Sequence, residues 1–158
     1  RHLERMRLRA VSISGDQQEG SIWEAALCAA HYKLDNLCAM VDLNGLQIDG
    51  KTADVLNIEP LAEKWRAFNW NVLEIDGHDM QACCDALDAA EQTRGKPSLV
   101  IAKTVMGKGV KWMENDEKWH GSPIGKDKLA AAIEELGFDK SFADVEVYKG
   151  HASDKLTV

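Results

Sequence analysis

The feature that most constrains the fold is an alternation of short apolar runs with longer segments of helical periodicity. The strand-like runs are Ala10–Ile13, Leu37–Val41, Val72–Ile75 and Ser98–Ile101. Runs that are apolar at nearly every residue are typical of strands covered on both faces of a parallel sheet. The pattern therefore predicts an α/β fold, a doubly wound and mostly parallel sheet flanked by helices. Such sheets bind ligands at the carboxyl ends of their strands.

Helical segments are expected between and after these runs, over residues 22–30, 60–68, 79–87 and 129–136. In each of them apolar residues recur with a spacing of three or four. Pro60 is suited to the first helical position and Asp79 to the N-cap. Gly137 is expected to end the last helix.

Composition restricts the class of protein. The 158 residues, 45% of them apolar, predict a single domain over residues 1–158, and the first residue, Arg1, favours a truncated or processed chain. The net charge of −7 argues against nucleic acid or an anionic membrane as partner. No apolar run approaches the roughly 20 residues that cross a bilayer. We expect a cytoplasmic protein.

The cysteines are Cys28, Cys38, Cys83 and Cys84. They lie in apolar patterns and lack paired CxxC spacing, so neither zinc nor a disulfide framework is expected. Buried free thiols in a reducing compartment are the prediction.

The segment 103–126 departs from this regular pattern. It contains four glycines, two tryptophans and His120, with little periodicity. Loops longer than about 15 residues inside a compact domain are usually functional or disordered, and two tryptophans argue against disorder. We predict an active-site loop.

Polar residues follow two of the predicted strands. Gly15-Asp16 comes after the first, and Asp42 and Asn44 come at the end of the second. Mg²⁺ prefers oxygen ligands and often shares them with phosphates, while glycines and a helix N-terminus admit a diphosphate. Turns rich in Gly, Asp and Asn are common at strand ends, so spacing alone leaves an ordinary turn as the alternative.

Several blocks resemble the transketolase form of the thiamine diphosphate motif, in order and at family-like spacing over residues 10–137. The blocks are Gly15–Ala25, Asp42–Gly50, Asp76–Asp79, Lys96–Ser98, Ala102–Gly109 and Trp119–Gly125. The pattern is most similar to two-subunit bacterial transketolases, whose corresponding domain is a separate N-terminal polypeptide. Thiamine-dependent E1 dehydrogenases are the alternative enzyme class, and the Gln-Ile-Asp-Gly and Trp-His-Gly blocks favour transketolase.

The resemblance implies a set of site residues. Asn44 would coordinate the metal through its side chain and Leu46 through its carbonyl. Gly15 would touch the diphosphate, and His120 would lie in the loop that closes over the cofactor and substrate. Glu19 and Glu24 would belong to an acidic network at a dimer interface, with Glu19 and His120 as the catalytic candidates. Glu24 also fits an ordinary solvated carboxylate, and His78 and His31 have only structural interpretations.

One position departs from the family pattern, in which Gly-Asp-Gly-Glu precedes the Glu-Gly pair. Aligned without a gap, Ser14 takes the place of the metal-binding aspartate. Aligned with a two-residue deletion, Asp16 is the metal ligand. A neutral hydroxyl is a poor substitute for a carboxylate on Mg²⁺. The ungapped alignment keeps Gly15 on the diphosphate and the spacing to Asn44, and both alternatives stay open.

The resemblance implies a transfer of a two-carbon ketol unit between sugar phosphates, with thiamine diphosphate as electron sink. It also implies Mg²⁺ (or Ca²⁺ or Mn²⁺) as the metal. The implied partners are a second copy of the chain, a C-terminal subunit carrying the pyrimidine-binding domain, or both. We expect the chain to be inactive alone, because the cofactor-activating glutamate of the family lies outside it. The rival from another class is a non-catalytic remnant or interaction module.

Overall fold

The computed structural model describes residues 8–138. Four strands form one parallel sheet in the order β1-β2-β6-β5. Their bounds are Leu8–Ile13 (β1), Leu37–Leu43 (β2), Asn71–Asp76 (β5) and Ser98–Lys103 (β6). The four predicted strands are confirmed, and each is two residues longer than its apolar run. The extra residues at the carboxyl ends carry the polar groups described below.

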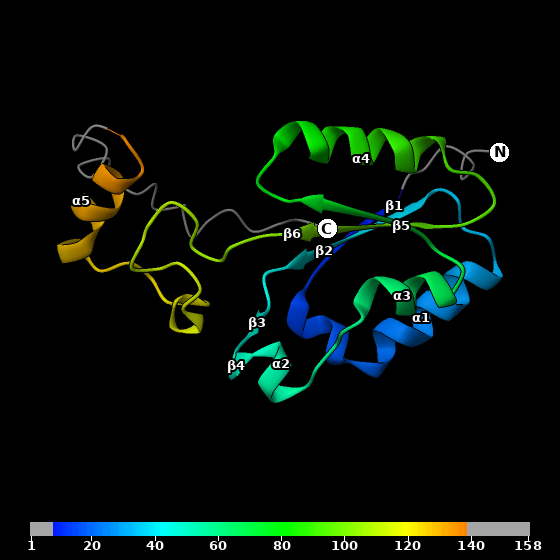
Figure 1. The fold of residues 1–158 in the computed structure, drawn as a ribbon, viewed down its shortest axis with the longest axis horizontal. Helices are drawn as coiled ribbons and strands as arrows, with labels where there is room; N and C mark the ends of the chain where they lie inside the picture. The colour runs from blue at the N-terminus through cyan, green and yellow to red at the C-terminus, as the bar shows by residue number, and fades with distance from the viewer. Residues whose placement is uncertain (1–7, 139–158) are drawn as a thin grey trace, which may run out of the picture.

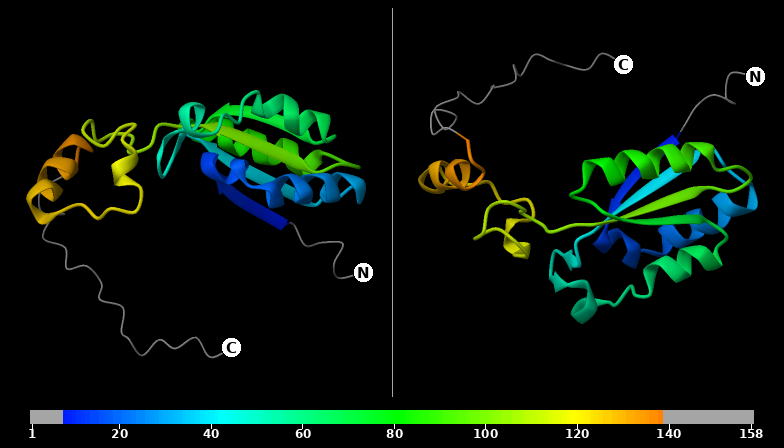
Figure 2. Two further views of the ribbon diagram at one scale, coloured as in Figure 1. Left: turned by 90° about the horizontal axis from the view of Figure 1, so that it is seen from below. Right: turned by 45° about the horizontal axis from the view of Figure 1, so that its top comes forward.

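Helices cover both faces of the sheet, as Figure 1 shows, with α1 and α3 on one face and α4 on the other. Their bounds are Gly20–His31 (α1), Leu61–Ala67 (α3) and Met80–Gln92 (α4). A 3-10 helix, η2 (Ser14–Gln18), joins β1 to α1. The doubly wound α/β arrangement predicted from the sequence is therefore confirmed, and the views in Figure 2 show the same layers.

The segment after β6 leaves the sheet and forms a separate lobe beyond the carboxyl ends of the strands (Figure 2). It contains η3 (Glu117–Trp119) and ends with α5 (Lys126–Glu135). Gly137 follows α5 with a φ of +76°, a left-handed conformation that suits glycine after a helix.

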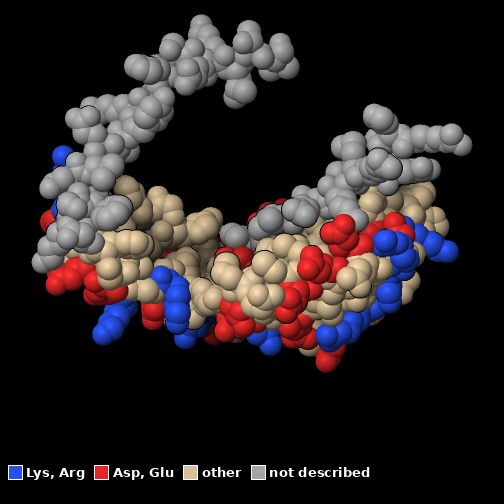
Figure 3. Space-filling model, turned by 90° about the horizontal axis from the view of Figure 1, so that it is seen from above, with Lys and Arg blue, Asp and Glu red and all other residues tan. Residues whose placement is uncertain are grey.

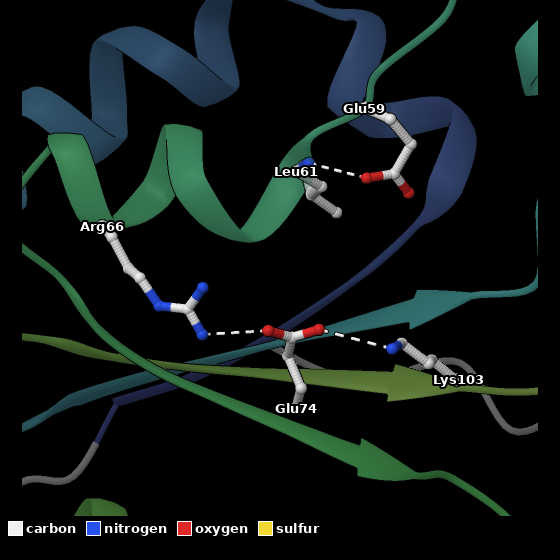
Figure 4. Close-up of polar contacts among 5 residues, drawn as sticks. All are labelled: Glu59, Leu61, Arg66, Glu74 and Lys103. Atoms are coloured by element: carbon white, nitrogen blue, oxygen red, sulfur yellow. Dashed lines mark hydrogen bonds and ion pairs between the residues drawn. The ribbon is translucent and has the colours of Figure 1, made fainter.

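The helix starts follow ordinary capping chemistry. The Asp79 side chain accepts hydrogen bonds from the amides of Gln81 (2.9 Å) and Ala82 (3.2 Å), which confirms it as the N-cap of α4. Pro60 is the N-cap of α3 rather than its first residue, so the predicted start was one residue early. The Glu59 carboxylate accepts from the amide of Leu61 (2.8 Å; Figure 4), which satisfies a donor that the helix leaves free.

The main core lies between the sheet and the α1–α3 layer. Val41, Leu99 and Ile101 of the sheet are almost completely buried there. The indole N–H of Trp70 donates to the Ala26 carbonyl (2.9 Å), and that of Trp65 donates to the buried Gln17 side chain (3.1 Å). The first bond ties the segment after α3 to α1, and the second ties α3 to η2, the turn that follows β1.

Two features differ from expectation. A small antiparallel ribbon of β3 (Leu46–Gln47) and β4 (Gly50–Lys51) follows β2 and leads into a short helix, α2 (Thr52–Val55). The four cysteines are free, but Cys28 and Cys84 are exposed on α1 and α4 and the other two are half-buried. The prediction of buried thiols was wrong, because the two helices turn Cys28 and Cys84 away from the sheet.

On the face drawn in Figure 3, acidic and basic side chains are interspersed and do not gather into a basic patch. Within residues 8–138, no helix is long and apolar enough to cross a membrane.

Candidate functional site

Ser14 joins the turns that follow β1 and β2. Its hydroxyl accepts hydrogen bonds from the amides of Asn44 (3.1 Å) and Gly45 (3.3 Å). The same hydroxyl donates to the Asp42 carbonyl (3.0 Å) and lies 3.4 Å from Asn44 Oδ1. Ser14 is 0% exposed. A hydroxyl has one proton and two acceptor positions, so this one is fully used by the protein.

The Asn44 side chain shapes the turn at the end of β2. Its Oδ1 accepts from the amide of Leu46 (2.9 Å), as asparagine often does two residues along the chain. Gly45 between them has a φ of +73°, which a side chain rarely tolerates. The turn thus carries the chain from β2 into β3.

A cavity of about 140 Å³ lies between this turn and the lobe that follows β6. The residues that line it come from both sides: Asp42, Asn44, Leu46, Gln47, Met106, Glu117 and His120. It therefore lies where a parallel sheet is expected to bind ligands, beyond the carboxyl ends of its strands.

The lobe has its own packing. The rings of Trp112 and Trp119 meet edge to face with centroids 5.0 Å apart, and the Lys128 ammonium lies 5.3 and 5.2 Å from these two centroids. The His120 amide donates to the Glu117 carbonyl (2.9 Å). These contacts give the long segment a defined shape around His120.

Three of the predicted site residues meet at the cavity, namely Asn44, Leu46 and His120. Within the described part of the chain, Gly15, Asp16 and Glu19 are not among the residues that line it. Gly15 lies directly behind the lining, because a Cβ added to it would stand 3.1 Å from Gln47 Cβ.

The remaining predicted residues lie farther along η2 and α1. Asp16 is half-buried within η2, and Glu19 and Glu24 are exposed at and near the start of α1. The acidic dimer network therefore stays a prediction.

Gln47 is a candidate that the sequence reasoning did not single out. Its Nε2 is buried and has no hydrogen-bond partner within residues 8–138, and the residue lines the cavity. Unpaired buried donors are rare and mark positions where a ligand or water completes the bonding. The residue stands in the block that resembles transketolase, but nothing in the sequence showed that its amide would lack a partner.

The residues around the cavity suit the two components of a metal–diphosphate cofactor unequally. The unpaired Gln47 amide and the nearby His120 suit an oxyanion such as a phosphate oxygen. A divalent cation fits poorly: the Ser14 hydroxyl is already saturated, and Asn44 Oδ1 accepts from Leu46. Among residues 8–138, no group of three or more His, Cys, Asp or Glu is placed to hold a metal. The assignment of Asp16, Asn44 and Leu46 to a metal stays a prediction.

Comparison with known proteins gives relatives of one kind. The chain is 41% identical over 122 residues to a 6-deoxy-6-sulfo-D-fructose transketolase subunit of a Clostridium species, covering 77% of this chain and 44% of the relative. It is 42% identical to one subunit of the apulose-4-phosphate transketolase of Phocaeicola vulgatus, covering 77% and 43%. The chain thus spans less than half the length of these relatives.

Solved structures agree. Transketolase from Campylobacter jejuni superposes with a TM-score of 0.79 at 36% identity, covering 85% of this chain and 21% of that one. Transketolase from Leishmania mexicana gives 0.77 at 30% identity, covering 84% and 20%. Residues 9–156 match the family profile described as "Transketolase, thiamine diphosphate binding domain". The chain belongs to this transketolase family.

Proposed function

We propose that this chain is the diphosphate-binding part of a transketolase that moves a two-carbon ketol unit between sugar phosphates. The observation that carries the proposal is the cavity beyond β2 and β6, where Asn44 and Leu46 meet His120 from the other end of the fold. The chain spans 44% of the Clostridium 6-deoxy-6-sulfo-D-fructose transketolase subunit, so we assign the activity to an assembly that contains further residues.

Thiamine diphosphate, when bound, supplies the electron sink for breaking the ketol carbon–carbon bond. The chain's own residues hold and enclose it. The Gln47 amide would donate to a diphosphate oxygen, and His120 lines the same cavity. Met106, Glu117 and His120 of the lobe form one side of the cavity and would shield a bound diphosphate from water, which would strengthen these hydrogen bonds.

The proposed partners are a second copy of this chain and a subunit that completes the cofactor site with its pyrimidine-binding domain. Two relatives named as transketolase subunits support a split enzyme. In this assembly Glu19 and Glu24 of α1 face the second copy. The chain alone is inactive, and the proposed compartment is the cytoplasm.

Calorimetric titration with thiamine diphosphate, with and without Mg²⁺ and in the presence of the completing subunit, tests the proposal. We expect saturable binding that weakens about tenfold or more in His120→Ala, since a donor to a charged oxygen is lost. Gln92→Ala, at the exposed end of α4 and away from the cavity, is the control and should bind normally. Thiamine without its diphosphate should bind far more weakly. No binding in any of these mixtures contradicts the proposal.

Ser14 favours a second function, a non-catalytic module that keeps the fold and its contact surfaces. The hydrogen bonds of the Ser14 hydroxyl join the two strand ends and use all of its donor and acceptor positions. The same titration separates the two functions: a module of this kind binds its partner subunit but takes up no thiamine diphosphate.

A further inference from the structure

The turn after β5 contacts the point where the chain leaves β6. β5 and β6 are neighbours, and Asp76 is paired with Lys103 at their carboxyl ends. The Gly77 amide donates to the Lys103 carbonyl (2.8 Å), and the Val105 amide donates to Nε2 of His78 (2.8 Å). Two successive residues of the turn therefore hold the first residues of the outgoing segment.

The turn is itself rigidly mounted. The Asp76 carboxylate accepts from the His78 amide (2.9 Å), and the Asp79 amide donates to the Asp76 carbonyl (3.2 Å). Asp79 then caps α4, so His78 stands between a sheet strand and a helix start, both fixed by their own hydrogen bonds. An imidazole held in this way can fix the position of the segment that follows β6.

Close packing adds to the hydrogen bonds. A Cβ on Gly77 would stand 2.5 Å from Thr104 Cγ2, closer than real side-chain contacts come, and 3.0 Å from Ala102 Cβ, a very tight contact. The turn therefore reaches the end of β6 only because residue 77 lacks a side chain. Gly77 thus allows the backbone of the turn to approach β6 closely, and His78 supplies the side-chain atom that accepts from Val105.

Thr104 is held from the other side. Its amide donates to the Leu43 carbonyl (3.3 Å), and its hydroxyl donates to the Asp42 carboxylate. Thr104 is thus bound to β2 and Val105 to His78, immediately before the lobe begins. The direction in which the lobe departs is set at these two residues.

We propose that His78 is a positioning residue: by accepting from the Val105 amide it fixes the departure of the lobe and so places His120 over the cavity. The bond requires Nε2 to be unprotonated, with the proton on Nδ1. The expected effect on thiamine diphosphate binding rests on the proposed function, whereas the hydrogen bond between His78 and Val105 does not. Sequence reasoning gave His78 only a structural role in its turn.

A matched pair of variants tests the contact. His78→Gln keeps an acceptor at about the distance of Nε2, whereas His78→Asn suits the turn but is one methylene too short. Hydrogen exchange of the full chain should show the Val105 amide exchanging about tenfold faster in His78→Asn and near the parent rate in His78→Gln. Amides of β6, such as Leu99 and Val100, should be unchanged, and His31→Asn should behave as the parent.

The proposal is overturned if the Val105 amide exchanges at the same rate in the parent and in His78→Asn. It is also overturned if this amide exchanges as fast in His78→Gln as in His78→Asn. A second arm measures thiamine diphosphate binding with the completing subunit. If the parent binds thiamine diphosphate, the affinity of His78→Asn should be several-fold lower and that of His78→Gln should equal the parent's. Equal affinities of the two variants overturn the positioning role. If the parent does not bind, the proposed function fails, and the exchange result alone decides whether His78 fixes Val105.

Discussion

At the scale of single residues, Ser14 decides how the strand ends are held together. It is completely buried, and its hydroxyl joins the backbone of β2 to the turn beyond it. Ser14 is also hydrogen-bonded to Asn44, and in the ungapped alignment it would stand where the family has a metal-binding aspartate; the choice between Ser14 and Asp16 stays a prediction. If the ungapped alignment holds, this hydrogen-bond network contains a neutral hydroxyl where the family pattern has a carboxylate.

Replacing Ser14 with aspartate should therefore replace the hydrogen bonds of a neutral hydroxyl with a carboxylate that needs a metal ion to balance its charge. Without Mg²⁺, a buried carboxylate should lower the free energy of unfolding by about 1–3 kcal/mol. With Mg²⁺ and thiamine diphosphate the loss should be recovered, and Mg²⁺-dependent binding should strengthen about tenfold, ~1.4 kcal/mol. Thermal unfolding and calorimetry measure both effects, with Gln92→Asp at the exposed end of α4 as control. If Asp16 is the metal ligand instead, Ser14→Asp does not strengthen binding and Asp16→Asn weakens it.

A substitution at Gln47 should lower the affinity for thiamine diphosphate without lowering the free energy of unfolding. Its Nε2 is buried without a partner among residues 8–138, so Gln47→Leu removes an unpaired donor and keeps a similar volume. The free energy of unfolding should stay within ~1 kcal/mol of the parent or rise. Affinity for thiamine diphosphate should fall about tenfold, because a bond to a charged oxygen is lost. The exposed Gln92→Leu is the control, and unchanged affinity in Gln47→Leu would show that the amide does not face the ligand.

At the scale of elements, ion pairs tie the edge strand β5 to its neighbours. The Glu74 carboxylate accepts from Arg66 of α3 (2.9 Å) and lies 3.3 Å from the Lys103 ammonium at the end of β6 (Figure 4). The hydrogen bond from Arg66, with a smaller contribution from Lys103, holds the pKa of Glu74 below its ordinary value. The Glu74 side chain is 36% exposed, so solvent screens the pairs.

Because the pKa is lowered on folding, ionised Glu74 stabilises the folded state above the pKa of the unfolded chain. That contribution is lost as the pH falls through the lower pKa of the folded state. Glu74→Gln should therefore reduce the free energy of unfolding by about 0.2–1 kcal/mol at neutral pH, and by nothing at acid pH. Urea unfolding across this range measures the difference, with exposed Glu24→Gln as control. A difference that persists in acid would assign the effect to packing.

The regular elements could be predicted because each depends on local signals. The strands are apolar on both faces, and Asp79 and Gly137 stand at positions where capping chemistry is specific. The ribbon of β3 and β4 could not be predicted, since strands of two residues carry no periodicity. The exposure of Cys28 was missed for another reason, because α1 is apolar around much of its circumference.

The candidate site was predictable only in part. Asn44, Leu46 and His120 stand in blocks whose residue types are distinctive, so the resemblance was enough to select them. The unpaired amide of Gln47 and the acceptor role of His78 depend on contacts with residues far along the chain. His78 meets Val105 across 27 positions and Ser14 meets Asn44 across 30, and no local pattern encodes such pairs.

At the scale of the whole molecule, α1 leaves large apolar side chains in solvent. Leu27 is 60% exposed, and Tyr32, directly after the helix, is 68% exposed. An apolar cavity of about 180 Å³ lies beneath the same helix, lined by residues that include Ile22 and Ala26. Exposed apolar groups of this kind commonly mark surfaces that another chain covers. A second copy of this chain is the occupant that we propose for α1.

We therefore predict self-association of the chain at roughly tens of micromolar. The net charge of −7 opposes contact between copies, so added salt should strengthen the association by screening this repulsion. Changing Leu27 and Tyr32 together to serine should shift the chain toward monomer, because the apolar area that drives contact is removed. Met80→Ser is the matched control, since Met80 is 66% exposed but belongs to α4 on the opposite face of the sheet. Sedimentation equilibrium measures the shift; a parent chain that is wholly monomeric under these conditions, or a control that dissociates equally, rules out α1 as the contact surface.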